Sequence, residues 1–212
     1  MKSTDALGRK GALVWSALRL VLPRKVRWFY EGHPRLRGQM WYAERRLIYQ
    51  TVRRHKPQHC FEIGTWQGGG STLFISQALR DNGAGKLHTV EVDRGFYEEA
   101  VRKYREYVPA LTPHVEFHYG DYREEYGAIL EKGGGVDFLL LDGQEDPEET
   151  LEQFEFFRPY ASGGTILMAH DWYTDKCALL RTALEGSGQW EILTVMGPPR
   201  SVGLVVAVRK SP

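Results

Sequence analysis

The chain has 212 residues, of which 42% are hydrophobic and 12% aromatic. This composition is typical of a folded globular protein and excludes a disordered or collagen-like chain. The net charge of +1 conceals an uneven distribution: residues 1–60 hold 14 Lys/Arg and 3 Asp/Glu, whereas residues 61–212 hold 14 Lys/Arg and 24 Asp/Glu. The two cysteines form no CxxC motif and predict no disulfide framework. We therefore expect a basic arm joined to an acidic globular body.

Residues 4–22 form the first candidate helix, whose broad apolar face is interrupted by basic residues. The apolar run from Gly11 to Leu22 is too short to span a bilayer, and no small-x-small cleavage site follows it. The segment fits a helix that packs on its own protein or on a second subunit, as in a homodimer. It also fits an interfacial helix attracted to anionic lipid. We expect a cytoplasmic protein, with peripheral membrane contact through residues 4–22 as an alternative.

Residues 23–38 mix basic and aromatic side chains. This combination occurs in nucleic-acid-binding segments, and equally in a loop or lid over a pocket, where Gly32-His33-Pro34 favours a turn. Residues 40–54 predict a helix that ends before Pro57, because apolar and charged side chains alternate at helical spacing. Residues 1–57 are therefore expected to form a basic, partly helical arm or lid in front of a domain over residues 58–212.

From residue 58 onward, short apolar strands alternate with amphipathic helices. Five strands are expected over residues 59–63, 86–92, 115–119, 136–141 and 164–169, followed in turn by helices over 71–80, 96–107, 123–132, 147–157 and 174–186. No helix fits between two last strands over 190–195 and 202–208, so these should pair antiparallel. The pattern predicts an α/β fold, a Rossmann-like doubly wound, seven-stranded and mostly parallel sheet with a C-terminal antiparallel β-hairpin.

The stretch from Cys60 to Ser71 contains a strand, a glycine-rich turn and a helix start. Glycines let a backbone approach a ligand, and the helix start offers free N–H groups. A dinucleotide fingerprint is missing, because Trp66 and Gln67 follow Gly64 where a second glycine is needed. The bulk of Trp66 disfavours a diphosphate and hence a nicotinamide dehydrogenase. The turn better suits a nucleoside with a charged amino-acid end and no phosphate.

Other polar residues follow the second and third strands, and the carboxyl ends of parallel strands meet at one edge of a sheet. Glu91 ends the second strand, where a carboxylate can accept both hydroxyls of a ribose. Asp121 and Tyr122 follow the third strand, where an acid can accept an adenine amino proton and a ring can stack. Asp121 is equally well placed to cap the next helix.

These motifs, in this order and spacing, resemble the class I S-adenosylmethionine (SAM)-dependent methyltransferases. The matching segments are FEIGTWQG (61–68), TVEVD (89–93), GD (120–121), DFLLLDG (137–143) and GGTIL (163–167), and the resemblance spans about residues 58–209. The nearest likeness is to small-molecule O-methyltransferases, which implies SAM as the cofactor and a small-molecule acceptor as the partner. It implies cofactor contacts from Glu62, Gly64, Trp66, Gly68, Glu91, Asp121, Tyr122 and Asp142.

The resemblance also concerns the ends of the fourth and fifth strands. Asp142 and Asp171 match positions that bind a divalent metal such as Mg²⁺ in metal-dependent members of the family. His170 replaces the first residue of the usual acid pair, which disfavours Mg²⁺, because this ion prefers oxygen ligands. His170 can instead act as a general base that Asp142 or Asp171 orients. A histidine that only hydrogen-bonds the turn is the alternative, and His170 and Asp142 are the catalytic candidates.

The expected reaction is O-methylation of a small-molecule hydroxyl, assisted by a strand-end base or a divalent metal. Two alternatives stay open. The basic arm suits an RNA methyltransferase, although the sequence has no [DN]PP[YF] segment of the kind expected for amino-group methylation of bases. This absence makes nucleic acid a disfavoured partner. The other alternative is a membrane-associated, cofactor-binding protein without turnover.

Overall fold

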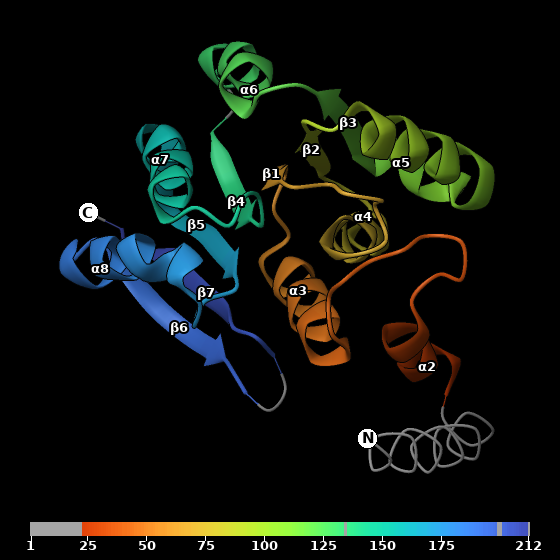
Figure 1. Cartoon of the computed structure of the whole chain (residues 1–212), viewed down its shortest axis with the longest axis horizontal. Coiled ribbons are helices and arrows are strands. Elements are labelled where there is room, and N and C mark those ends of the chain that lie inside the picture. Colours follow the sequence, from red (N-terminus) through yellow and green to blue (C-terminus); the bar gives the residue numbers. More distant parts are fainter. Residues whose placement is uncertain (1–22, 134, 199–200, 212) are drawn as a thin grey trace, which may run out of the picture.

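The computed structural model describes residues 23–133, 135–198 and 201–211. Its centre is a seven-stranded sheet in the order β3-β2-β1-β4-β5-β7-β6 (Figure 1). The strands are β1 (His59–Ile63), β2 (Lys86–Glu91), β3 (Val115–Tyr119), β4 (Val136–Leu141), β5 (Ala161–His170), β6 (Trp190–Met196) and β7 (Leu204–Arg209). The first five pair in parallel, whereas β7 pairs antiparallel with both β5 and β6. The predicted fold class is confirmed, including its C-terminal antiparallel hairpin.

Helices cover both faces of the sheet. They are α2 (Arg24–Glu31), α3 (Tyr42–His55), α4 (Ser71–Asn82), α5 (Arg94–Tyr107), α6 (Tyr122–Glu131), α7 (Pro147–Phe157) and α8 (Ala178–Gly186), with short 3-10 turns η1 (Pro109–His114), η2 (Arg158–Tyr160) and η3 (Asp175–Cys177). Side chains of α3, α4 and α5 form one core with the sheet, and those of α6, α7 and α8 form the other. This is the doubly wound arrangement expected of alternating strands and helices.

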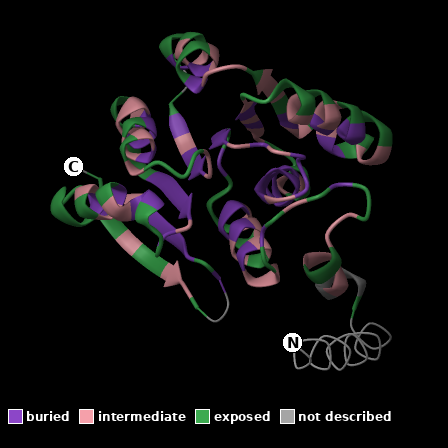
Figure 2. Ribbon diagram, viewed as in Figure 1, coloured by how far each residue is buried: buried purple, intermediate pink, exposed green. Residues whose placement is uncertain are grey.

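Strand β4 shows why the sheet is covered on both faces. Phe138 and Leu140 lie in the core on the α4 side, whereas Leu139 and Leu141 lie in the core on the α7 side. Successive side chains of a strand point to opposite faces, so a strand that is apolar almost throughout needs cover on both. Figure 2 shows the resulting pattern, in which the central strands are buried and the outer faces of the helices are exposed.

Residues 24–31 form the helix α2, so the expectation of a loop over residues 23–38 is wrong for this stretch. The reason is tertiary packing. The Trp28 ring lies 4.3 Å from that of Phe74 on α4, and the Phe29 ring lies 5.2 Å from that of Tyr49 on α3. The rings of Trp28 and Phe29 are thus partly buried against the protein, whereas the neighbouring Tyr30 is exposed. The helix expected over residues 4–22 lies outside the described residues.

Helix α3 belongs to the same core as the sheet. Ile48 and Val52 are completely buried in it, and Leu36 and Met40 from the preceding segment are buried there with 4% of their surface exposed. Residues on both sides of the boundary expected after residue 57 therefore share one core. In the part of the chain that the structure describes, no helix is both long enough and apolar enough to cross a membrane.

The segment from Leu36 to Gly38 crosses directly over the glycine turn that follows β1. The backbone N–H of Gly69 donates to the carbonyl oxygen of Arg37 at 2.9 Å. A Cβ on Gly38 would lie 2.2 Å from the carbonyl carbon of Gly69, and a Cβ on Gly69 would lie 2.4 Å from the Arg37 oxygen. Contact between two backbones therefore requires both glycines, whereas the sequence suggested that the glycines of this turn face a ligand.

Gly69→Ala is expected to lower the free energy of unfolding by about 1–3 kcal/mol, the usual cost of overpacking, because the added methyl has no room beside Arg37. Gly127→Ala is the matched control. Gly127 lies inside α6, nothing lies within 4 Å of its Cβ position, and helix propensity favours alanine there by up to ~1 kcal/mol. Urea denaturation followed by circular dichroism measures both variants, and equal stabilities would contradict the backbone contact.

Candidate functional site

A cavity of about 500 Å³ lies at the carboxyl ends of β1, β2, β4 and β5. Its wall includes seven residues that the sequence singled out, namely Gly64, Trp66, Glu91, Tyr122, Asp142, His170 and Asp171. The structure thus brings together most of the predicted site, as the topology of a doubly wound sheet requires. Three other predicted cofactor contacts, Glu62, Gly68 and Asp121, do not belong to this wall.

Glu91 is fixed at the cavity wall by two backbone N–H groups. Its Oε2 accepts a hydrogen bond from the N–H of Trp66 at 2.7 Å, and its Oε1 accepts one from Asp93 at 3.0 Å. The first bond also holds Trp66 at a φ of 48°, a left-handed conformation uncommon outside glycine. A carboxylate has about four acceptor positions, so Glu91 keeps the capacity to bind two further hydroxyls from the cavity.

Gly64 and Gly68 have different neighbours. Gly64 has a φ of 97°, and a Cβ there would lie 2.2 Å from the carbonyl oxygen of Asp142, so glycine lets the turn after β1 meet the loop after β4. Gly68 instead faces α5, where its carbonyl oxygen accepts a hydrogen bond from Tyr104 Oη at 3.0 Å. A Cβ on Gly68 would lie 2.9 Å from the Tyr104 ring. Gly64 therefore shapes the cavity, and Gly68 shapes the packing behind it.

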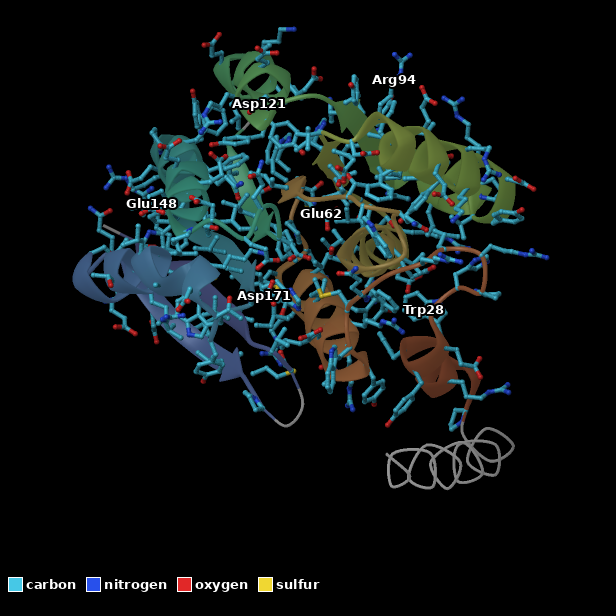
Figure 3. All side chains as sticks on the ribbon, in the orientation of Figure 1. Trp28, Glu62, Arg94, Asp121, Glu148 and Asp171 are labelled. Atoms are coloured by element: carbon cyan, nitrogen blue, oxygen red, sulfur yellow. The ribbon has the colours of Figure 1, made fainter. Side chains whose placement is uncertain are left out.

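Glu62 is a residue of β1 and lies beside α4 (Figure 3), and it does not belong to the cavity wall. It is completely buried, and its Oε2 accepts hydrogen bonds from Thr72 Oγ1 at 2.6 Å and Thr89 Oγ1 at 2.7 Å. Burial raises its pKa to about 7, against the opposing effect of the surrounding hydroxyls. Glu62 therefore joins β1, β2 and α4, while its expected contact with the cofactor stays a prediction.

Asp121 and Tyr122 begin α6 but differ in position. Asp121 caps the helix, because its Oδ1 accepts a hydrogen bond from the backbone N–H of Arg123 at 2.8 Å. Figure 3 shows Asp121 beside α6, apart from Asp171. Tyr122 lines the cavity, and its buried hydroxyl makes no hydrogen bond within the described residues. The Tyr122 hydroxyl is thus a buried polar group without a partner among the described residues, on a residue that lines the cavity.

His170, the last residue of β5, has a carboxylate on each side of its ring. Its Nδ1 lies 3.2 Å from both Asp142 Oδ1 and Asp171 Oδ2, and its Nε2 lies 3.2 Å from Glu44 Oε1. Burial opposes ionisation, but these hydrogen bonds outweigh it and raise the pKa of His170 to about 12. The ring is therefore an imidazolium with both nitrogens protonated. Such a ring has no lone pair for a substrate proton or a metal ion, so this arrangement opposes both expected roles.

Glu44 is a site residue that sequence reasoning missed. It lies on the first turn of α3, is completely buried, and accepts hydrogen bonds from the Trp41 N–H at 2.6 Å and from Ser201 Oγ at 2.5 Å, besides contacting His170. Burial acts against ionisation, but these bonds lower its pKa. Its position at the third residue of a helix, where glutamate often reaches back to the helix start, was the available signal.

Lys176 is the second residue that the sequence did not single out. Its Nζ lies 3.2 Å from Asp142 Oδ1 and 3.1 Å from Asp171 Oδ2, and the residue is 2% exposed. Burial opposes its charge, but the two carboxylates raise its pKa. The helix expected over residues 174–186 begins with η3 and becomes α8 only at Ala178, and Lys176 lies within this 3-10 turn.

The cluster does not fit a divalent metal as it stands. Asp142, His170 and Asp171 lie close enough together to ligate one ion. However, His170 has no free lone pair, and each of the two carboxylate oxygens already pairs with both His170 and Lys176. A ligand set for Mg²⁺ requires free oxygen atoms around a nearly octahedral ion. The metal positions implied by the resemblance are thus present, but their charge is already balanced by protein cations.

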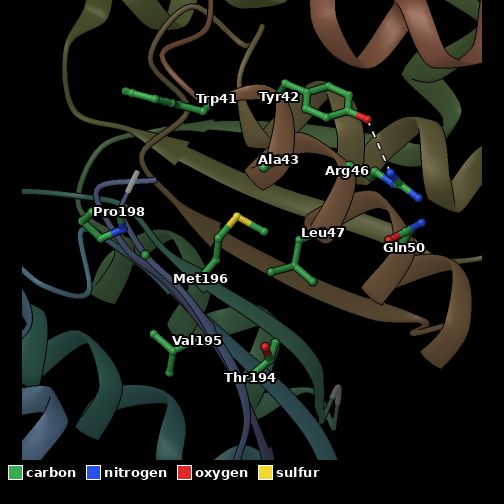
Figure 4. A pocket seen from close by; sticks show the side chains of 11 residues that line it. Trp41, Tyr42, Ala43, Arg46, Leu47, Gln50, Thr194, Val195, Met196 and Pro198 are labelled. Carbon is green, nitrogen blue, oxygen red and sulfur yellow. Dashed lines mark hydrogen bonds between the residues drawn. The ribbon is translucent and has the colours of Figure 1, made fainter. Parts of the chain in front are cut away.

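A second hollow, of about 890 Å³, lies between α3 and β6 (Figure 4). Apolar side chains such as Leu47 and Met196 form much of its wall, and Arg46 lies at its edge with a hydrogen bond to Tyr42. Among the described residues that line it there is no carboxylate or histidine, so we assign no chemistry to it. Trp41 lines both hollows.

The pKa of Glu62 predicts a pH-dependent stability. The folded protein holds the proton of the Glu62 carboxyl group more tightly than the unfolded chain does, since the pKa of Glu62 is about 7 in the folded protein against an ordinary 4.5. The free energy of unfolding therefore falls as the pH rises from 4.5 to about 7, by on the order of 3 kcal/mol. Glu62→Gln cannot ionise, so it should gain stability relative to the natural protein as the pH rises.

Urea denaturation at about pH 5 and about pH 8 measures this effect. Glu131→Gln, a change of an exposed residue at the end of α6, is the matched control and should keep the natural pH profile. If Glu62→Gln had the same pH profile as the control, the buried carboxylate would not be the source of the pH-dependent stability.

The comparisons with known proteins begin with a family model described as "Methyltransferase domain", which matches residues 61–172. No curated protein sequence matches the chain significantly. Among solved structures, the O-methyltransferase TomG from Streptomyces achromogenes, involved in tomaymycin synthesis and determined in complex with SAM, has a TM-score of 0.67 and 18% identity, and the match covers 90% of this chain and 91% of that one.

Two further solved structures show a similar fold. An O-methyltransferase from Bacillus cereus, in complex with SAH, has a TM-score of 0.66 and 17% identity, covering 99% of this chain and 93% of that one. A putative caffeoyl-CoA O-methyltransferase from Staphylococcus aureus has a TM-score of 0.68 and 14% identity, covering 93% and 98%. The family match spans more than half of the chain, from Phe61 in β1 to Trp172, just after Asp171. The resemblance found in the sequence is thereby confirmed, and the chain belongs to the methyltransferase-domain family.

Proposed function

We propose that this methyltransferase uses SAM to methylate a hydroxyl oxygen of a small molecule in the cavity at the strand ends. One observation carries the proposal: the anchored carboxylate of Glu91 and the cluster around His170 both lie in the wall of that single cavity. The first suits the ribose of a nucleoside and the second suits a reacting hydroxyl. SAM and SAH in the structures of TomG and the Bacillus cereus enzyme support the choice of cofactor.

The residues of the cavity fit SAM. Glu91 can accept two ribose hydroxyls, and the rings of Trp66 and Phe96, whose centroids lie 5.9 Å apart, provide apolar wall beside it. The unpartnered hydroxyl of Tyr122 offers a hydrogen bond to the base. When bound, SAM supplies a methyl group activated by its sulfonium. The wall also contains Asp93 and Glu145, so its overall charge suits a ligand with a net positive charge.

The acceptor end of the cavity is formed by the loops after β4 and β5. The Asp142 side chain is 24% exposed and that of Asp171 is 16% exposed, so Asp142 is the more accessible carboxylate. We assign proton acceptance to Asp142: as the acceptor oxygen bonds to the methyl carbon, its hydroxyl proton passes to this carboxylate, and the electron pair of the broken carbon–sulfur bond stays on sulfur. The imidazolium of His170 holds Asp142 in place for this step.

The arm gives little support to RNA methylation. Arg45 donates to the carbonyl oxygens of Phe29 and Tyr30, and Arg53 donates to Asn82 Oδ1 at 2.6 Å, so these arginines serve contacts within the protein. The acidic wall of the cavity also disfavours a phosphate backbone. Residues 4–22, on which the expected membrane contact and homodimer depend, lie outside the described residues.

Glu91→Ala is expected to weaken SAH binding about 100-fold, because two hydrogen bonds to a charged carboxylate are lost. Isothermal titration calorimetry measures the affinity, and thermal melting checks that the turn around Trp66 stays folded. Glu98→Ala, which changes an exposed residue of α5, is the control and should bind like the natural protein. Unchanged binding by Glu91→Ala would contradict the ribose site, and no SAM binding by the natural protein would overturn the proposal.

Asp142→Asn is expected to lower the rate of methyl transfer by about 10²–10⁴, the usual contribution of a proton-accepting group. Transfer of a labelled methyl group from SAM to a panel of hydroxylated small molecules measures the rate. SAH affinity, measured in parallel, should change far less than the rate. An equal loss of both would assign Asp142 to cofactor binding alone.

A further inference from the structure

The two carboxylates expected to hold a divalent metal already share a protein cation. Lys176 Nζ lies 3.2 Å from Asp142 Oδ1 and 3.1 Å from Asp171 Oδ2. A divalent ion bound to the same two oxygens would lie about 2.0–2.6 Å from each, and would therefore meet the ammonium group at close range. Two cations that need the same oxygen atoms repel each other strongly in a buried place, so the ammonium and a metal exclude one another here.

Lys176 is also held firmly in this position. It is 2% exposed, and the turn that carries it is tied to β5 on both sides. On one side, the backbone N–H and the Oγ1 of Thr174 donate to the Asp171 carbonyl oxygen, each at 2.9 Å. On the other side, Cys177 Sγ lies 3.2 Å from the carbonyl oxygen of His170. These contacts fix the backbone that carries Lys176 relative to Asp171 and His170.

The contacts of the two carboxylates agree with this arrangement. The Asp142 and Asp171 oxygens that face Lys176 also face the His170 ring, so each oxygen already has two nitrogen partners within 3.2 Å. Removal of the Lys176 amine would free one side of both oxygens, where a metal ion that prefers oxygen ligands can approach.

We infer that Lys176 takes the place of a divalent metal in this methyltransferase and that methyl transfer proceeds without such an ion. Lys176 is then a positioning residue, which holds Asp142 and Asp171 at the acceptor end of the cavity. Its role in methyl transfer rests on the proposed function. The exclusion of the metal rests only on the cluster and can be tested separately.

The test titrates the full-length protein with Mn²⁺ alone and measures free Mn²⁺ by electron paramagnetic resonance. The natural protein should show no saturable site at millimolar Mn²⁺, and added Mn²⁺ should leave its melting temperature unchanged. Lys176→Met should acquire one saturable site, and Mn²⁺ should raise its melting temperature. The double variant Asp142→Asn, Lys176→Met should lose that site again, because one of the two carboxylates is gone.

Lys103→Met is the matched control. Lys103 is also a buried lysine, 8% exposed, and it pairs with a single acid, Glu99, at 2.6 Å outside the cluster. Its loss should create no Mn²⁺ site. If the natural protein bound Mn²⁺ saturably and Asp142→Asn removed that binding, the inference would be overturned. A Lys176→Met protein that folds but has no saturable Mn²⁺ site would also overturn it. Calorimetry with SAH on the same proteins keeps the outcomes separate, since failure to bind SAH would overturn the proposed function alone.

Discussion

Two backbones meet without intervening side chains where residues 36–38 cross the glycine turn, and this contact places the arm and the cavity together. The hydrogen bond from Gly69 to Arg37 secures the turn from one side, and the Glu91 carboxylate secures it from the other. Beyond the crossing, the chain passes through Gln39 and Trp41, which line the cavity, and enters α3. The arm is thus a part of the cavity wall.

The sheet could be predicted from the sequence because its signals are local. The continuous apolar run of β4 indicates cover on both faces, and the short span between the last two strands excludes a helix and requires an antiparallel hairpin. Helix α2 could not be predicted in this way. Its eight residues are amphipathic, but so short a segment is marginal as an isolated helix, and its apolar face is buried by the contacts of Trp28 and Phe29 with α4 and α3, which are distant in the sequence.

The candidate site also contains some residues that could be predicted from the sequence and others that could not. Glu91 could be found because strand topology places the ends of parallel strands at one edge of the sheet, and Asp142 and His170 because the resemblance to a known family gives the ends of β4 and β5 a role. Glu44 and Lys176 could not, because they come from the arm and from a 3-10 turn, and only the tertiary structure buries their charges. The sequence identified the histidine but not the partners of its two nitrogens, and these partners determine that it is a cation. Residue type thus indicated which side chains belong to the site, and their contacts in the folded protein define the charge and role of each.

The distance along the chain between Glu44 and its partners has a consequence for protein synthesis. His170 follows Glu44 by 126 residues and Ser201 follows it by 157. A ribosome has therefore made most of the chain before either of these two partners exists. Until then Glu44 Oε2 can accept from the nearby Trp41 N–H, but Oε1 must stay in water, because burial without a partner is costly. Docking of α3 against the end of β5 is consequently a late event in biosynthesis, and a nascent chain that stops before residue 170 has no means of completing the cavity.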